Sequence, residues 1–236
     1  MDRVSWARLE DEIGRRGGAS FWWRDDDAAL PNPALERLMA FDVPLALAVV
    51  PQLAVPELFH LLKDSVSVLQ HGTDHCNRAA PGEKKTEFPA AEPDELALER
   101  LAAASQRLRK MAGARALPVL VPPWNRMRPG LADKLSAAGF IGLSQDGKAR
   151  PVQGLKQVNT HIDIVAWHEG RRFIGEEQAL SAALKLMDVV QPVGWLTHHA
   201  VHDEAAWRFL ERLARVEGVR WQSAAELFSY TRPGHG

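Results

Sequence analysis

The chain has almost no cysteine, no excess of charge of either sign and no long apolar run. Its single cysteine, Cys76, cannot form a disulfide within the chain of 236 residues. With 29 basic and 30 acidic side chains, the sequence has neither a basic nucleic-acid footprint nor an acidic tail. The longest uncharged apolar stretch, residues 43–56, is shorter than the roughly 20 residues that span a bilayer, and it contains three prolines. We therefore expect no nucleic-acid partner and no membrane span.

The chain also begins without a recognisable leader. Its first ten residues contain no apolar segment of the kind found in secretory signal peptides. Because neither a leader nor a disulfide is in evidence, we expect a cytoplasmic location. What the sequence does have is apolar material: 46% of its side chains are hydrophobic, enough for a core in one α/β domain or in two small ones.

Short runs of β-branched and aromatic residues alternate with longer amphipathic segments, which predicts strands and helices in turn. Strands followed by helices imply parallel neighbours, and seven or eight such units favour a barrel over an open sheet. The predicted strands are residues 19–24, 45–50, 66–70, 117–121, 141–144, 161–167, 194–198 and 219–221. The predicted helices are residues 33–41, 56–63, 93–111, 130–138, 176–190, 204–216 and 224–229.

Three adjacent aspartates follow the first predicted strand. Asp25, Asp26 and Asp27 come directly after Arg24, and their carboxylates repel one another unless a cation or a functional demand holds them together. Sites of α/β folds lie at this end of the strands. A solvated acidic turn or a helix cap is the alternative reading.

Two histidines, His71 and His75, follow the predicted strand 66–70. At spacing i and i+4 they lie on one face of a helical turn, so both imidazoles can converge on one ion. Two nitrogen ligands and one carboxylate leave open positions on a divalent metal, as a catalytic site requires. Zinc suits these ligand types best, with Co²⁺, Ni²⁺ and Mn²⁺ also compatible. The alternative is a pair of surface histidines at a helix start.

A third cluster follows the predicted strand 117–121. Pro123 and the proline before it stiffen the loop, Trp124 offers an apolar face suited to a sugar ring, and Asn125 and Arg126 offer hydrogen bonds. The alternative is a rigid turn that carries a surface tryptophan.

The fourth cluster ends the predicted strand 194–198. His198 and His199 are both candidates for a general acid near neutral pH, or else one is buried and the other solvated. Asp163 and Trp167, on the strand before, either orient such a histidine and line a pocket or belong to the core and its rim.

In this order, the four clusters resemble the motifs of the polysaccharide deacetylase family, also called the NodB-homology or carbohydrate esterase family four group. The segment from Arg24 to Ala28 is similar to the motif Thr-Phe-Asp-Asp-Gly, whose first aspartate is the catalytic base and whose second is a metal ligand. This register makes Asp26 the base and Asp27 the ligand, whereas a slip of one residue makes them Asp25 and Asp26.

The remaining motifs follow the family with two departures. His71 and His75 match the motif His-Ser/Thr-X-X-His, which supplies two metal ligands, but Gly72 replaces the hydroxyl residue. Residues 122–125 resemble Arg-Pro-Pro-Tyr-Gly, but Val121 stands where the base-orienting arginine belongs, and Arg24 or Arg126 is the candidate replacement. Residues 196–198 resemble the motif Leu-X-His.

The last motif makes His198 the general acid, and Asp163 corresponds to the family's histidine-orienting aspartate. The resemblance further implies a distorted (β/α)₇ barrel, with residues 1–236 as one catalytic domain. It also implies a divalent metal, Zn²⁺ by preference, that activates water for the hydrolysis of an N- or O-acetyl group. The expected partner is an acetylated saccharide or a small amide. The residues expected to contact it are Arg24, Asp25, Pro123, Trp124, Asn125, Arg126, Asp163, Trp167 and His199.

Two other functions are compatible with these residues. One is a cytosolic C–N hydrolase of a small cyclic amide on the same fold, which the lack of a leader favours over a cell-wall enzyme. The other is a non-catalytic member that binds a glycan or a metabolite, which the valine at position 121 favours.

Overall fold

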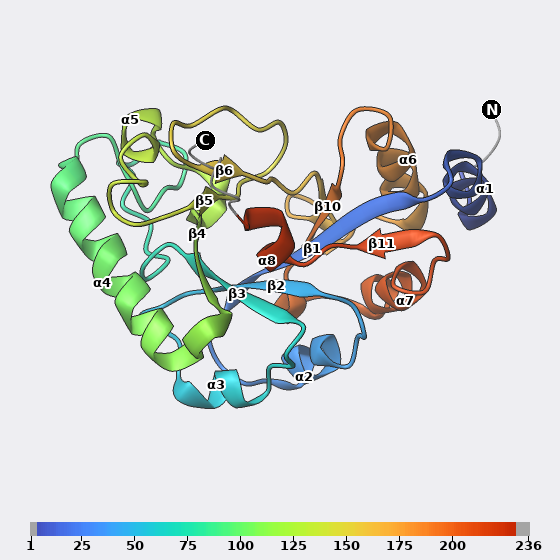
Figure 1. The fold of residues 1–236 in the computed structure, drawn as a ribbon, viewed down its shortest axis with the longest axis horizontal. Coiled ribbons are helices and arrows are strands. Elements are labelled where there is room, and N and C mark those ends of the chain that lie inside the picture. Colours follow the sequence, from blue (N-terminus) through green and yellow to red (C-terminus); the bar gives the residue numbers. More distant parts are fainter. Residues whose placement is uncertain (1–3, 230–236) are drawn as a thin grey trace, which may run out of the picture.

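The computed structural model describes residues 4–229, and its main feature is a curled parallel sheet with helices around it (Figure 1). Along the sheet the strands run in the order β6-β5-β4-β3-β2-β1-β10-β7, and β11 pairs with β1 beside this path. All of these pairs are parallel, as the alternation of strands and helices predicts. These strands are β1 (Ala19–Ala28), β2 (Leu45–Val49), β3 (Val66–His71), β4 (Ala116–Val121), β5 (Gly142–Leu143), β6 (Lys156–Gln157), β7 (Ile162–Asp163), β10 (Val193–Thr197) and β11 (Val219–Trp221).

The pairing of β5 with β6 is short and interrupted. Beyond these strands an isolated parallel bridge from Asp146 to Thr160 continues the same register, and the chain then enters β7, which pairs with β10. A separate antiparallel pair, β8 (Val165–Ala166) with β9 (Arg172–Phe173), lies outside the main sheet. The predicted strand 161–167 is therefore two short strands that belong to different sheets.

The helices differ from the predicted ones mainly in length, and one was not predicted. They are α1 (Trp6–Arg16), α2 (Pro33–Met39), α3 (Pro56–His60), α4 (Asp94–Ala112), α5 (Pro129–Ala132), α6 (Glu176–Leu186), α7 (Glu204–Leu213) and α8 (Ala224–Phe228), with short 3₁₀ turns η1 (Gly113–Arg115), η2 (Pro123–Asn125) and η3 (His199–Val201). None of the helices within residues 4–229 is long and apolar enough to cross a membrane.

The unpredicted helix α1 has ordinary start and stop signals. Ser5 accepts a hydrogen bond from the backbone of Arg8 as the N-cap, and Gly17 ends the helix with φ +72°. Its buried residues Trp6, Leu9 and Ile13 lie three and four positions apart, on one face. The sequence analysis overlooked this pattern because the segment comes before the first strand.

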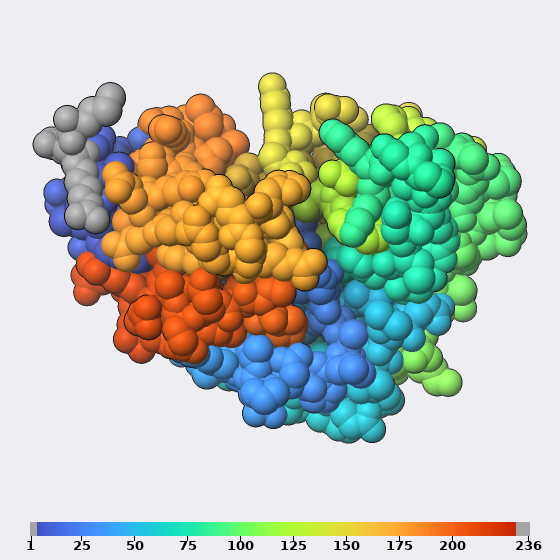
Figure 2. Space-filling view, turned by 180° about the vertical axis from the view of Figure 1, so that it is seen from behind, coloured from blue at the N-terminus to red at the C-terminus, as the bar shows by residue number. Residues whose placement is uncertain are grey.

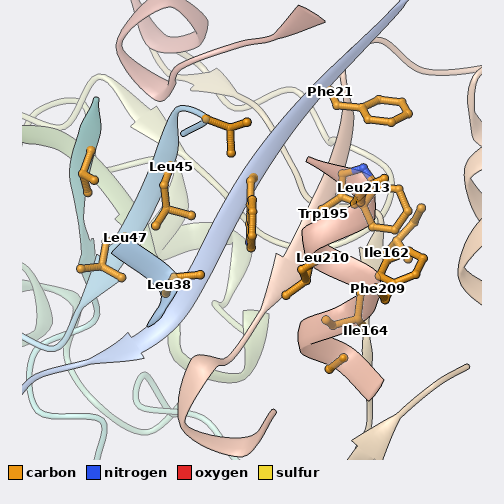
Figure 3. Close-up of a cluster of buried hydrophobic side chains, with 14 of the residues drawn as sticks. Phe21, Leu38, Leu45, Leu47, Ile162, Ile164, Trp195, Phe209, Leu210 and Leu213 are labelled. Atoms are coloured by element: carbon orange, nitrogen blue, oxygen red, sulfur yellow. The ribbon is translucent and has the colours of Figure 1, made fainter. Parts of the chain in front are cut away.

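Strand alternation sorts the buried side chains into an outer and an inner layer. On the outer face, Phe21 and Trp195 pack with Phe209 of α7 in a large cluster that Figure 3 shows in close-up. On the inner face, Trp22 packs in a smaller cluster that includes Phe228 of α8, and Figure 1 shows α8 over the middle of the sheet. Successive residues of β1 therefore face different layers, and this alternation decides which aspartate reaches the inside.

Candidate active site

The sequence predicted a strand that ends at Arg24, before the three aspartates. In the structure β1 instead continues through all three of them. The alternation that points Trp22 inward also points Arg24 and Asp26 inward, and it points Asp25 to the outer layer. At Asp27 the backbone has φ +71°, and the register of β1 with β2 shifts between Asp25 and Ala28. Such an irregularity turns a side chain out of the regular pattern. The Asp27 side chain is 41% exposed, whereas Asp26 is buried.

Asp27 meets the two histidines at the carboxyl ends of the strands. Its Oδ1 lies 3.1 Å from His71 Nε2 and 3.2 Å from His75 Nε2, and one ligand atom from each of the three residues lies within 4.8 Å of the others. His71 Nδ1 lies 3.0 Å from the carbonyl oxygen of Val121. A proton on Nδ1 donated to that carbonyl leaves the Nε2 lone pair facing Asp27, the usual support for a ligating histidine.

These donors fit a divalent ion such as Zn²⁺, because two imidazole nitrogens and one carboxylate oxygen form a three-ligand set with room for a further ligand. Burial raises the pKa of the Asp27 carboxyl, but while no ion is bound, protonated imidazoles of His71 and His75 donate hydrogen bonds to it and hold the pKa well below its usual range. A carboxyl group that stays ionised is ready to bind a cation.

The route by which the histidines converge differs from the predicted helical turn. His71 is the last residue of β3, and the chain then bends through Gly72 with φ +58° and His75 with φ +57°. A Cβ at position 72 would lie 2.2 Å from Glu87 Oε2 and 2.6 Å from Pro123 Cδ. Gly72 therefore replaces the expected hydroxyl residue because that position has neither the space nor the backbone angle for a side chain.

Glu87 is a site residue that the sequence analysis missed. It is fully buried, and its carboxylate accepts hydrogen bonds from the backbone N–H of Thr73 at 2.8 Å and of His75 at 3.1 Å, and from the Thr73 hydroxyl. Arg100 Nη1 lies 3.6 Å away and balances its charge. Glu87 thus holds the backbone of residues 73–75, which carries the candidate ligand His75. Glu87 itself lies in a long loop without a periodic sequence pattern, so no signal in the sequence marks it.

We expect Glu87→Gln to weaken zinc binding by about 10-fold, the lower end of the range for groups that support metal ligands. The amide keeps one acceptor oxygen but turns an NH₂ group toward donors, so the loop that carries His75 is held less firmly. Competition against a chromophoric chelator measures this affinity. The matched control is Glu83→Gln, an exposed glutamate of the same loop. Equal zinc affinity in the two variants would contradict this role.

Arg24 clamps Asp26 inside the barrel. Its Nε lies 2.8 Å from Asp26 Oδ1 and its Nη2 lies 3.0 Å from Oδ2, a bidentate pair with both side chains buried. The remaining guanidinium N–H groups bond Asn125 Oδ1 at 2.8 Å, Ser144 Oγ at 2.7 Å and the Gln145 carbonyl at 3.2 Å.

Of the two arginines expected to stand in for the one missing at Val121, Arg24 is thus the one that contacts Asp26. Arg126 is exposed and bonds the carbonyl oxygen of Lys85 instead. The expectation that Arg24 contacts substrate is corrected, because its side chain is fully buried and its donors are already engaged.

Asp25 and His199, also expected to contact substrate, are buried against each other. The Asp25 carboxylate is 0% exposed and lies 2.5 Å from His199 Nδ1, and His199 is 2% exposed. Burial opposes charge on both groups, but their mutual attraction lowers the pKa of Asp25 and raises the pKa of His199. Neither side chain is available to a substrate.

His198 lies at the end of β10 beside Asp163 and Trp167. Its Nδ1 is 3.9 Å from Asp163 Oδ1, and its ring meets Trp167 edge-on at 4.7 Å between centroids. Trp167 is 38% exposed and donates its indole N–H to Asp163 Oδ2 at 2.7 Å. Burial raises the pKa of Asp163, although His198 and Trp167 act against it. These three residues form the second half of the candidate site.

Residues 123–125, which follow β4, lie beside the metal ligands and beside the pair of Arg24 and Asp26. The Trp124 ring lies 4.4 Å from that of His75, Asn125 contacts Arg24, and Pro123 is buried next to Gly72. Figure 2 views the side on which these segments meet: gold, lime and teal surfaces surround a hollow in which dark blue atoms from the β1 region lie deepest. The site is thus an open hollow.

A further histidine near the site gives a prediction about pH. His202 Nε2 accepts a hydrogen bond from the backbone N–H of His198 at 3.3 Å, which requires an unprotonated nitrogen. Burial lowers the pKa of His202 from 6.5 to about 4; His199 and His198 act in the same direction and Asp25 opposes them. Because the unfolded chain takes up the proton more readily, His202 makes folding less favourable as pH falls from 6.5 toward 4.

The loss reaches about 3 kcal/mol at pH 4, since one pH unit between folded and unfolded pKa values corresponds to about 1.4 kcal/mol. Urea unfolding of the protein and of His202→Gln from pH 7 to pH 4 measures it. We expect the free energy of unfolding to fall by about that much more in the protein than in the variant. Parallel pH profiles would contradict the assignment.

Comparisons with known proteins show the fold. No family model and no curated protein matches the sequence. A protein from Mycobacterium smegmatis that is described as a polysaccharide deacetylase is similar in structure, with a TM-score of 0.62 and 16% identity over 99% of this chain and 98% of that one. The peptidoglycan deacetylase PdaC from Bacillus subtilis gives a TM-score of 0.56 and 15% identity over 89% and 90% of the chains.

A mutant of a carbohydrate esterase family four pseudoenzyme gives a TM-score of 0.57 and 14% identity, covering 90% of this chain and 68% of that one. The distorted (β/α)₇ barrel expected from the resemblance is therefore confirmed. At identities this low, and with a pseudoenzyme among the neighbours, the likeness extends to the fold and not to the activity.

Proposed function

We propose that the chain is a metal-dependent hydrolase that removes N- or O-acetyl groups from a saccharide. The observation that carries the proposal is the meeting of a three-residue metal-ligand set, Asp27, His71 and His75, with the clamped carboxylate of Asp26 on the adjacent residue of β1. A metal alone would be compatible with a structural role. A buried carboxylate held in one orientation beside an open metal site is what hydrolysis of an acyl group requires.

In the proposed reaction, Asp26 is the general base and His198 is the general acid. An ion held by Asp27, His71 and His75 would supply Lewis-acid chemistry, lowering the pKa of water and polarising the acyl carbonyl. Asp26 takes a proton from the attacking water, and Arg24 fixes the direction in which its carboxylate points. His198 donates a proton to the leaving nitrogen or oxygen as the bond to the acyl carbon breaks, and acetate is the second product.

Side chains around the hollow support a saccharide as the substrate. Trp124 lies beside the ligand His75 and Trp167 beside His198, so an aromatic face accompanies each half of the site. Sugar rings present apolar C–H faces that stack on such side chains. Asn125 and Arg126 supply polar groups nearby, and Zn²⁺ is the metal we propose from the ligand types.

A substrate screen with zinc-loaded protein tests the proposal. Acetate release is measured on O-acetylated and N-acetylated sugars, and ring opening is measured on small cyclic amides. We expect acetate release that is abolished by a chelator and restored by zinc. Ring opening without acetate release would identify a C–N hydrolase on this fold, and saccharide binding without any hydrolysis would identify a non-catalytic binding protein; either result overturns the proposal.

A further inference from the structure

The proposed reaction does not use the buried pair of Asp25 and His199. A charged pair in the outer layer, among apolar side chains, is costly to bury unless each polar atom has a partner. Here every oxygen of the carboxylate has one. Oδ2 accepts from the Thr197 hydroxyl at 2.6 Å and from the backbone N–H of His199 at 3.0 Å, and Oδ1 accepts from His199 Nδ1 at 2.5 Å.

All of these donors belong to the residues on either side of His198. Asp25 is paired with Thr197 in the register of β1 and β10, and β10 ends at Thr197. Ladder hydrogen bonds stop at that point and the chain turns into η3. The carboxylate of Asp25 therefore supplies the hydrogen bonds that fix Thr197 and His199 just beyond the last ladder hydrogen bonds of β10. An apolar residue at position 25 would fill the same space but would accept none of these donors.

The side chain of His198, in contrast, has little to hold it. Its Nδ1 is buried and has no hydrogen-bond partner within residues 4–229, since Asp163 lies 3.9 Å away. The edge-on contact with Trp167 is apolar and weakly directional. The position of this imidazole is therefore set mainly by the backbone of residues 197–199.

The pair is itself braced. Trp23 donates its indole N–H to the Thr197 hydroxyl at 2.7 Å, and Asn32 Nδ2, in the N-cap residue of α2, lies 3.4 Å from His199 Nε2. A fully partnered polar network of this kind favours one arrangement of the chain over its neighbours.

We propose that Asp25 is a positioning residue that holds His198 in place for proton donation, by gripping Thr197 and His199 on either side of it. The inference rests on the proposed function, because it assigns a purpose to the pair through the acid role of His198. Of the three adjacent aspartates, Asp27 is the proposed metal ligand and Asp26 the proposed base. The inference gives Asp25 a role of its own.

The test compares two esters that differ in their need for an acid. Glucose pentaacetate has alcohol leaving groups, which depart more readily when protonated, whereas the phenolate of 4-nitrophenyl acetate departs unprotonated. Misplacing His198 should slow only the first, but loss of metal or of folded protein slows both. We expect Asp25→Asn to lower kcat on glucose pentaacetate by about 10- to 100-fold, part of the 10²–10⁴ that general acids contribute, and to leave 4-nitrophenyl acetate within about threefold.

Two further variants frame the result. Thr197→Val removes one of the donors with little change of shape, so we expect the same pattern with a smaller loss. His161→Ala removes a different side-chain contact to β10, the hydrogen bond from the backbone N–H of Gly194 to His161 Nδ1 at 2.9 Å, and should change neither ester reaction. Equal loss on both esters in Asp25→Asn and Thr197→Val, or no loss in either, would overturn the inference.

His198→Ala separates this inference from the proposed function. If His198→Ala loses activity on glucose pentaacetate and Asp25→Asn does not, the function stands and the positioning role fails. If the zinc-loaded protein hydrolyses neither ester and releases no acetate from N-acetylated sugars, the function fails, and amide hydrogen exchange tests the positioning role by itself. Release of the His199 N–H in Asp25→Asn, but not in His161→Ala, should then speed its exchange by about tenfold or more. An unchanged exchange rate of the His199 N–H in Asp25→Asn would show that Asp25 does not hold this backbone, and it would overturn the inference.

Discussion

Asp26→Asn is expected to lower kcat for acetate release by about 10²- to 10⁴-fold, the contribution of a positioned general base. The amide has nearly the shape of the carboxylate but cannot accept a proton from water. Arg24 keeps one acceptor at this position, and the metal ligands are not altered. The reaction should therefore lose its base and retain its metal.

Initial rates with the zinc-loaded variant measure this loss, and bound zinc is quantified in the same preparation. The matched control is Asp11→Asn, an exposed aspartate on α1, which should behave as the unaltered protein. If Asp26→Asn kept more than about a tenth of the activity, far above what loss of a general base allows, Asp26 would not be the base.

His71→Ala is expected to abolish stoichiometric zinc binding. His71 is buried, and its ring is held by the contact of Nδ1 with the Val121 carbonyl, so its Nε2 is the best oriented of the three ligand atoms. Removing a ligand should exceed the roughly 10- to 100-fold loss of affinity that follows removal of a supporting group. The loss should therefore be larger than in Glu87→Gln.

Zinc retained after dialysis, measured per chain, tests this expectation. His60→Ala serves as the control because His60 is an exposed histidine at the end of α3, before β3 begins, and is not one of the three grouped ligands. One zinc per chain retained by His71→Ala, at the affinity of the control, would show that the ion binds elsewhere or that His71 is not a ligand.

The sequence predicted the grouping of the site residues better than their local geometry. Asp27, His71 and His75 are of types that bind metals and follow predicted strands, so a parallel sheet places them at one end. Their turn, however, is set by φ +58° at Gly72 and by the burial of Glu87, and neither leaves a periodic signal in the sequence. The helical turn expected for the two histidines was wrong for this reason.

The register of the three aspartates depends on the length of β1. With the strand ended at Arg24, any of the three could face the inside. Because β1 runs on to Ala28, alternation takes Arg24 and Asp26 inward and Asp25 outward, and the irregularity at Asp27 frees the third side chain. Substrate contacts expected for Arg24 and Asp25 failed because both side chains are buried by partners distant in the sequence.

We propose that one divalent ion, held by Asp27, His71 and His75, makes this chain a deacetylase. The most direct test of this proposal is a titration of metal-free protein with zinc while acetate release from an acetylated sugar is followed. We expect activity to rise in proportion to added zinc and to level off at one equivalent per chain, in line with a single ligand set among the described residues. Full activity before zinc is added, or none at one equivalent and beyond, would contradict this role of the ion.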